Sequence, residues 1–211
     1  GKNNPSELGG VLNTLESAVG LAGTGDDSYL SEATMGAFMQ TVDTIASQDA
    51  AAEEVKTRCR EAAEQVMSAM LAGMEPGESA GVDLPTVQGR TINEGLDKLG
   101  GAALQAGGGS LTLPSDISEQ IRRHRRLRNL EGDETAGLLL THVNLPPETS
   151  ALSGVVTAEI IIEGEKMSTF SSPVAVKVPI PDGLGPASVG CLFADGSSWL
   201  GTGMVTSRVA A

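Results

Sequence analysis

The chain has 211 residues, of which 40% are hydrophobic and only 2% aromatic, and its formal net charge is -13 at pH 7. A chain of this length can bury one sizeable core or two small ones, built here from Leu, Val, Ile, Met and Ala. Its acidity argues against nucleic-acid binding, because a phosphate backbone requires Lys and Arg to displace its counterions. No apolar run reaches about 18 residues, so we predict no membrane span within this sequence. Since the sequence starts at Gly1 without an initiator Met, we expect it to be a segment of a longer precursor.

The first part of the chain carries apolar residues at helical spacing. Asn4-Pro5-Ser6-Glu7 offers an N-cap, a proline at the first helical position and a following carboxylate, which predicts a helix start. Three amphipathic helices are predicted, and a shorter fourth helix is predicted at about Val87 to Leu104. The apolar stripes of the four predicted helices are Leu8, Val11, Leu12, Leu15 and Val19; Met35, Phe38, Met39, Val42 and Ile45; Val55, Cys59, Ala62, Val66, Met70 and Leu71; and Ile92, Leu96 and Leu99.

The hydrophobic period changes after Gly107-Gly108-Gly109, which we interpret as the boundary between two subdomains. Strands are predicted at Leu138 to Val143, Val155 to Ile162 and Val174 to Ile180, separated by Gly, Pro, Ser and Asn clusters. The last run alternates, so one of its faces should be buried and the other exposed. The predicted fold class is α+β, with a helical subdomain over 1–108 and an antiparallel β-sandwich subdomain over 109–211.

A basic run from Ile121 to Arg128 contains five of the chain's 14 Lys and Arg residues, namely Arg122, Arg123, Arg125, Arg126 and Arg128. Such a run can bind a polyanion, a lipid headgroup or an acidic partner, or form a dibasic processing site. The alternative is a solvated loop or helix end that Glu119, Glu131, Asp133 and Glu134 balance. In either case we predict that the run is exposed, because five guanidinium groups cannot all be desolvated without matching carboxylates.

No catalytic, metal or cofactor site is predicted. The two histidines, His124 and His142, do not lie beside a Cys or a second His at ligand spacing. The sequence contains no zinc-protease motif and no phosphate-binding loop. The step Ser153-Gly154 before Val155 has the reverse order of a self-cleaving glycine-serine step and indicates a turn that leads into a strand. We therefore expect that the protein is not an enzyme.

The two cysteines have different surroundings. Cys59 lies on the apolar stripe of the third predicted helix, where a thiol usually behaves as a small buried hydrophobe. Cys191 precedes Leu192 and Phe193, and the only tryptophan, Trp199, follows in a turn-rich stretch. We predict that Trp199 packs against the strand from Val174 to Ile180, as one large aromatic should anchor an aromatic-poor β half.

Three stretches together resemble the GAIN region of polycystins and egg-jelly receptors, which adhesion receptors share. They are Ser110-Leu111-Thr112-Leu113-Pro114, Phe170-Ser171-Ser172-Pro173-Val174-Ala175-Val176, and Cys191-Leu192-Phe193 followed by Trp199-x-x-x-Gly203. The last stretch is similar to the opening of the GPS motif and places a GPS-like start at 191–204, with Cys191, Phe193, Trp199 and Gly203 in structural roles. By this resemblance the helices correspond to GAIN subdomain A and the strands to subdomain B.

Two departures from the family pattern limit what the resemblance implies. Met204 stands where the motif has a cysteine, so one of the two disulfides of the GPS motif cannot form in the usual way. The later cysteines and the His-Leu-Ser/Thr tripeptide that carries cleavage do not occur before Ala211. We therefore expect that this polypeptide does not cleave itself.

The resemblance implies a non-catalytic juxtamembrane module on the extracellular side of a cell-surface or ciliary membrane. Its expected roles are adhesion, mechanical coupling or assembly, with a polycystin-type channel subunit or other segments of its own precursor as protein partners. Two alternatives stay open. One is a secreted or cell-surface structural assembly protein with the same fold, and the other is an intracellular helical adaptor.

Overall fold

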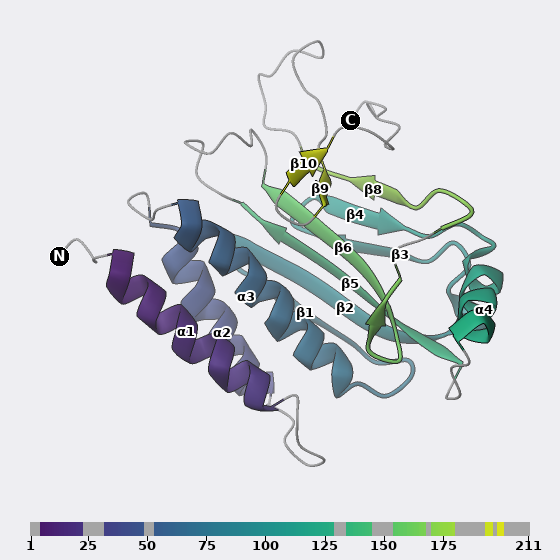
Figure 1. Cartoon of the computed structure of the whole chain (residues 1–211), viewed down its shortest axis with the longest axis horizontal. Coiled ribbons are helices and arrows are strands. Elements are labelled where there is room, and N and C mark those ends of the chain that lie inside the picture. The colour runs from purple at the N-terminus through teal and green to yellow at the C-terminus, as the bar shows by residue number, and fades with distance from the viewer. Residues whose placement is uncertain are drawn as a thin grey trace, which may run out of the picture. The chain divides into compact units, whose positions relative to one another are not determined.

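In the described residues three helices come first and antiparallel sheets follow them, with a further helix among the strands, which confirms the predicted α+β fold class (Figure 1). The structure is a computed structural model of the chain and describes residues 5–22, 32–48, 53–128, 134–144, 154–167, 170–179, 193–195 and 198–200. The chain divides into two units, Gly1–Pro179 and Ile180–Ala211.

Three helices of the first unit pack together through their apolar stripes. They are α1 (Pro5–Ala22), α2 (Glu32–Ala46) and α3 (Glu53–Ala72). The helical spacing in the sequence predicted these stripes, and most of their members are buried, although Val11 is 45% exposed. The buried stripe positions are Leu8, Leu12, Leu15, Val19, Met35, Met39, Val42, Ile45, Val55, Cys59, Ala62, Val66, Met70 and Leu71.

A five-stranded antiparallel sheet has the order β1-β2-β5-β6-β7, and the three helices cover one of its faces (Figure 1). Its strands are β1 (Ser79–Asp83), β2 (Val87–Gly95), β5 (Thr135–Val143), β6 (Val155–Ile162) and β7 (Glu165–Lys166). Strand β5 is buried on both faces: Leu139 and Val143 join the core under the helices, whereas Leu138 and Leu140 join a second core. The predicted strands at Leu138 to Val143 and Val155 to Ile162 are therefore confirmed.

A three-stranded antiparallel sheet, β3-β4-β8, forms the other side of the second core. It consists of β3 (Ala103–Ala106), β4 (Gly109–Thr112) and β8 (Ala175–Lys177), and a 3-10 turn, η1 (Leu96–Lys98), precedes it. The second core also takes residues from a fourth helix, α4 (Ile117–Arg128). The result is three layers, namely helices, a large sheet and a small sheet.

Polar contacts connect the helices to the large sheet. The Oδ1 atom of Asp43 on α2 accepts hydrogen bonds from the backbone N–H groups of Thr86 (2.6 Å) and Val87 (3.0 Å), at the turn between β1 and β2. On α3, Glu64 accepts a 2.6 Å hydrogen bond from the Thr157 hydroxyl of β6. Burial raises the pKa of Glu64, and this hydrogen bond acts in the opposite direction. Both contacts fix the register between layers.

The prediction of a fourth helix at Val87 to Leu104 is wrong. This segment forms β2, η1 and the start of β3. Because both faces of β2 are covered in part, its apolar residues lose the strict alternation that marks a half-exposed strand, and the remaining spacing imitates a helix. Gly89 faces the helix layer, where an added Cβ would lie 3.0 Å from the Met67 sulfur.

The change from helix to strand also lies elsewhere than predicted. Helix α3 ends at Ala72 and β1 begins at Ser79, so the helical part does not extend to residue 108. Gly107 and Gly108 form the turn of the β3–β4 hairpin instead, with φ values of 56° and 80°, and Gly109 begins β4. A two-residue turn with positive φ at both positions matches the twist of a hairpin and favours glycine.

The expected half-buried strand from Val174 to Ile180 is only partly present. Strand β8 covers Ala175–Lys177, and all three of its residues are exposed, with Val176 at 43%. Val174 packs against the second core at the end of this strand. Strand β8 is an edge strand of the small sheet, and its alternation in sequence did not translate into one buried face.

The second unit contains an antiparallel pair of short strands, β9 (Phe193–Asp195) and β10 (Ser198–Leu200). Their register places Leu200 opposite Phe193 and Trp199 opposite Ala194.

Candidate functional site

The basic run forms helix α4, and local contacts explain where this helix begins. The Asp116 carbonyl accepts backbone hydrogen bonds from Glu119 (3.1 Å) and Gln120 (3.2 Å). The Asp116 carboxylate accepts a 2.6 Å hydrogen bond from the Ser172 hydroxyl, which lowers the pKa of Asp116. Arginines in the last turn suit the negative end of the helix dipole.

Three of the five arginines pair with carboxylates. Arg125 contacts Glu163 at 2.7 Å, Arg122 contacts Glu134 at 3.1 Å, and Arg128 contacts Glu165 at 3.6 Å. The prediction that the whole run is exposed is wrong for Arg125, of which only 7% is exposed, because the Glu163 carboxylate compensates its charge.

The predicted acidic neighbours of the run were only partly correct. Of the four, Glu134 is confirmed as a partner, whereas Glu131 and Asp133 lie outside the described residues. Sequence reasoning missed Glu163 and Glu165, which lie at the turn between β6 and β7. The sequence contained a signal for them, because Glu163-Gly164 separates two strand-like runs and can form a two-residue hairpin turn. Such a turn places the side chains of Glu163 and Glu165 at one end of the sheet.

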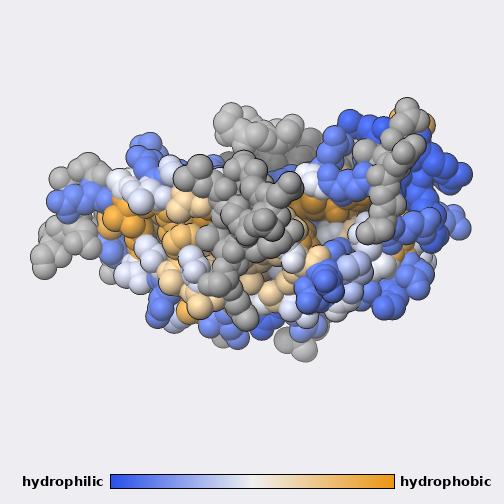
Figure 2. Space-filling model, turned by 90° about the horizontal axis from the view of Figure 1, so that it is seen from below, coloured by the Kyte–Doolittle hydropathy of each residue, from blue (hydrophilic) through white to orange (hydrophobic). Residues whose placement is uncertain are grey.

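The outer face of α4 stays accessible. Arg123 and Arg126 are exposed, and within the described part of the chain neither forms an ion pair with a carboxylate. The Arg126 Nε atom donates to the Arg122 carbonyl at 3.2 Å, and Leu127 beside it is 79% exposed. Strongly hydrophilic residues gather at the end of the first unit where α4 lies (Figure 2).

The GPS-like residues are described only in part. Phe193 and Trp199 lie on the paired strands β9 and β10, whereas Cys191 and Gly203 lie outside the described residues. The side-chain burial of Trp199 and its predicted contact with the strand from Val174 to Ile180 therefore stay predictions.

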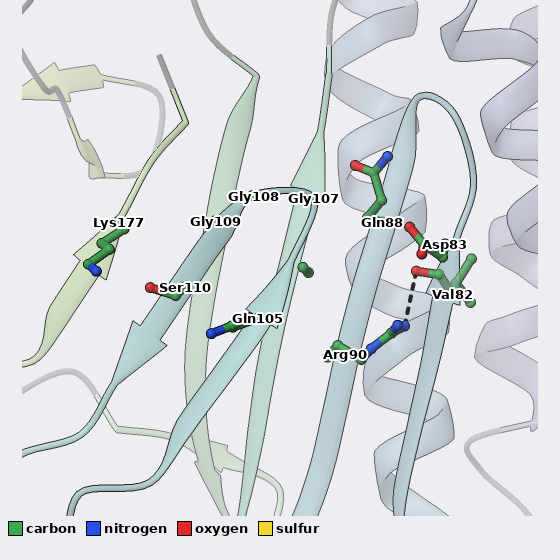
Figure 3. A pocket seen from close by; sticks show the side chains of 11 residues that line it. Val82, Asp83, Gln88, Arg90, Gln105, Gly107, Gly108, Gly109, Ser110 and Lys177 are labelled. Atoms are coloured by element: carbon green, nitrogen blue, oxygen red, sulfur yellow. Dashed lines mark hydrogen bonds between the residues drawn. The ribbon is translucent and has the colours of Figure 1, made fainter. Parts of the chain in front are cut away.

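A polar cavity of about 390 Å³ lies beside the β3–β4 turn (Figure 3). It is lined by Val82, Asp83, Gln88, Arg90, Gln105, Ala106, Gly107, Gly108, Gly109, Ser110 and Lys177. Arg90 points towards β1 and donates to the Val82 carbonyl at 3.4 Å, whereas Lys177 points in the opposite direction (Figure 3). The two cations do not converge on one point, so the cavity lacks the arrangement that would clamp a single anion.

A buried histidine lies next to this cavity. His142 on β5 is 6% exposed, and its Nδ1 atom is 3.1 Å from the Gln88 Oε1 atom. Gln88 donates its Nε2 hydrogen to the Leu84 carbonyl at 2.6 Å, so its oxygen accepts and His142 donates from Nδ1. The His142 Nε2 atom is buried and has no hydrogen-bond partner in the described part of the chain. Gly107 and Gly154 leave the space for this ring.

Acidification should destabilise the protein through His142. Burial lowers the pKa of His142, so below the unfolded-state pKa of about 6.5 the unfolded chain binds a proton that the folded chain does not. The free energy of unfolding is therefore expected to fall from about pH 6.5 down to the folded pKa. Urea denaturation across this range would measure the slope, and His142→Gln should reduce it. His124→Gln is the matched control, and an equal slope change in both variants would contradict this expectation.

The cysteine in the described residues has the features of a buried, unreactive thiol. Cys59 is fully buried on α3, and this burial raises the pKa of its thiol to about 12. In the described ranges no group of three or more His, Cys, Asp or Glu side chains could hold a metal ion. None of the helices in those ranges has the length and hydrophobicity that a bilayer crossing requires.

The comparisons with known proteins support the fold. No family model matches the chain, and no curated protein matches it. Among solved structures, the full extracellular region of zebrafish Gpr126/Adgrg6 is similar, with a TM-score of 0.67 and 12% sequence identity. The match covers 99% of this chain and 30% of that chain. The neighbour is the extracellular region of an adhesion receptor that contains a GAIN domain, and at this identity the likeness extends to the fold alone.

Proposed function

We propose that this chain is a non-catalytic module on the extracellular side of a larger membrane protein. The observation that carries the proposal is the similarity of its fold, over 99% of its length, to the extracellular region of an adhesion receptor. The separation of candidate catalytic groups in the described residues supports a non-enzymatic role. His142 hydrogen-bonds an amide, Cys59 is buried with a raised pKa, and neither faces the polar cavity as a lining residue.

The more specific proposal is a juxtamembrane, polycystin-like module of a cell-surface or ciliary protein, which acts in adhesion, mechanical coupling or assembly. Its support is the order of the resembling sequence stretches together with the packing of β5. This strand pairs with β2 over nine positions from Thr135 to Val143 and with β6 over seven positions from Gly137 to Val143. A central strand held on both sides has its backbone groups satisfied and is among the last to open, which suits a module that bears load.

A topology experiment tests the extracellular placement. The full-length protein, with an epitope tag at one end of this segment, would be expressed in cells and exposed to an impermeant biotin reagent before and after permeabilisation. We expect labelling of this segment in intact cells and retention of the protein in the membrane fraction. Labelling only after permeabilisation would contradict the proposal and favour the intracellular adaptor. Recovery of the full-length product in the medium without an anchor would favour the secreted structural protein.

The partner proposal has a separate test. A polycystin-type channel subunit would be co-expressed with the full-length protein, and crosslinking at the cell surface followed by mass spectrometry would identify the linked peptides. We expect crosslinks between this segment and either the channel subunit or another segment of the same precursor. Crosslinks to neither would contradict the assembly role and leave the placement test unaffected.

A further inference from the structure

The arginines of α4 differ in how deeply they are buried and in how much their ion pairs contribute to the fold. Arg125 is buried and paired, so it belongs to the structure of the first unit. The pair between Arg122 and Glu134 is different, since its side chains are 40% and 65% exposed. Exposed ion pairs contribute little to stability and exchange readily with other partners. The fold therefore leaves Arg122, Arg123 and Arg126 available for an external ligand.

Helical geometry places these three guanidinium groups on one face. At 3.6 residues per turn, positions 122, 123 and 126 share the side of α4 opposite to Ile117 and Ile121, both of which are fully buried in the second core. Arg126 lies about one turn, or roughly 5 Å, further along the axis than the other two. The face thus presents three positive charges in a short row, in a chain whose formal net charge is -13.

The chemistry of this row indicates a linear polyanion with repeated oxyanion groups. The guanidinium fork binds planar or tetrahedral oxyanions through two N–H groups, and a row of such forks suits a polymer better than a single small anion. A nucleic acid is the less favoured polyanion, because α4 carries no aromatic side chain on which a base could stack. Exposed Leu127 adds apolar surface next to the row, against which the C–H face of a sugar ring can pack.

We propose that the face of α4 formed by Arg122, Arg123 and Arg126 binds a sulfated glycosaminoglycan. This inference rests on the proposed extracellular placement, because that is where such polymers occur. The ligand would replace Glu134 at Arg122 and contact Arg123 and Arg126 directly, while Arg125 stays paired with Glu163 and holds the helix in place.

The test uses the purified 211-residue chain and immobilised heparin as the probe. Replacing all three arginines, in R122Q/R123Q/R126Q, is expected to weaken binding by about tenfold or more, and binding by the parent chain should weaken with salt. The matched control is K98Q/K166Q/K177Q, which removes the same charge from exposed positions elsewhere and should change the affinity by less than about threefold. Glu134→Gln should strengthen binding, because it frees Arg122 from its exposed partner.

Several outcomes would overturn the proposal. These are an absence of heparin binding at about 50 mM salt, equal losses in the two triple variants, or equal binding of heparin and unsulfated hyaluronan. Equal binding of heparin and single-stranded DNA would assign the face to polyanions in general and would also overturn the proposal. Circular dichroism would confirm that each variant is folded. Because the binding test needs no cells, its failure is distinguishable from failure of the topology experiment.

Discussion

Replacing Glu163 with glutamine should lower the free energy of unfolding by about 3 kcal/mol, because it removes a negative charge that pairs with a buried guanidinium. The Arg125 side chain is 9% exposed and its Nη2 atom lies 2.7 Å from the Glu163 Oε1 atom. Glu163 has a φ of 50°, in the left-handed region. Glutamine has the same backbone preferences there, so Glu163→Gln changes the charge and keeps the backbone strain.

The matched control for this prediction is Glu165→Gln, two residues further along the same turn. Glu165 pairs with Arg128 at 3.6 Å, and the side chains of this pair are 51% and 60% exposed. An exposed pair of this kind should contribute less than about 1 kcal/mol. Urea denaturation of both variants at neutral pH would measure the difference. Equal effects of the two substitutions would show that burial does not strengthen the pair of Arg125 with Glu163.

Gly107→Ala should lower the free energy of unfolding by a similar or larger amount, about 2–5 kcal/mol. At this position the strain of a left-handed backbone and a steric clash of the added Cβ act together. Gly107 has a φ of 56°, and a Cβ there would lie 2.2 Å from the His142 Nδ1 atom and 2.4 Å from the Gln88 Oε1 atom. Neither contact can be relieved without moving the hydrogen bond between His142 and Gln88. We expect the β3–β4 hairpin to separate from the large sheet. Hydrogen exchange would show this as reduced protection of the backbone amides of β3.

Gly101→Ala separates the two causes. Gly101 has a φ of 76°, but a Cβ there would meet nothing within 4 Å. Gly101→Ala should lower the free energy of unfolding only through the strain of a left-handed backbone, by about 1–2 kcal/mol. A Gly107→Ala variant that is no less stable than Gly101→Ala would contradict the close approach of the turn to His142.

The sequence by itself determined the helical layer and the fold class. Residues such as Leu12, Met39 and Val66 recur at helical spacing, and each of them is completely buried. This agreement has a local cause, because the side chains of one helix face are set by residues three and four positions apart. The runs that became β5 and β6 were recognisable for a similar reason, as both are aliphatic or β-branched and bounded by turn residues.

Only the tertiary structure decided which strands pair with one another and which charged side chains form ion pairs. The prediction of a helix for the segment of β2 was wrong, because its strand character depends on pairing with β5, which begins 40 positions after β2 ends. The burial of Arg125 depends in the same way on Glu163, and the environment of His142 depends on Gln88 and two distant glycines. Helical periodicity is a property of neighbouring residues, whereas strand pairing and charge compensation join residues far apart, so only the folded chain brings these determinants together.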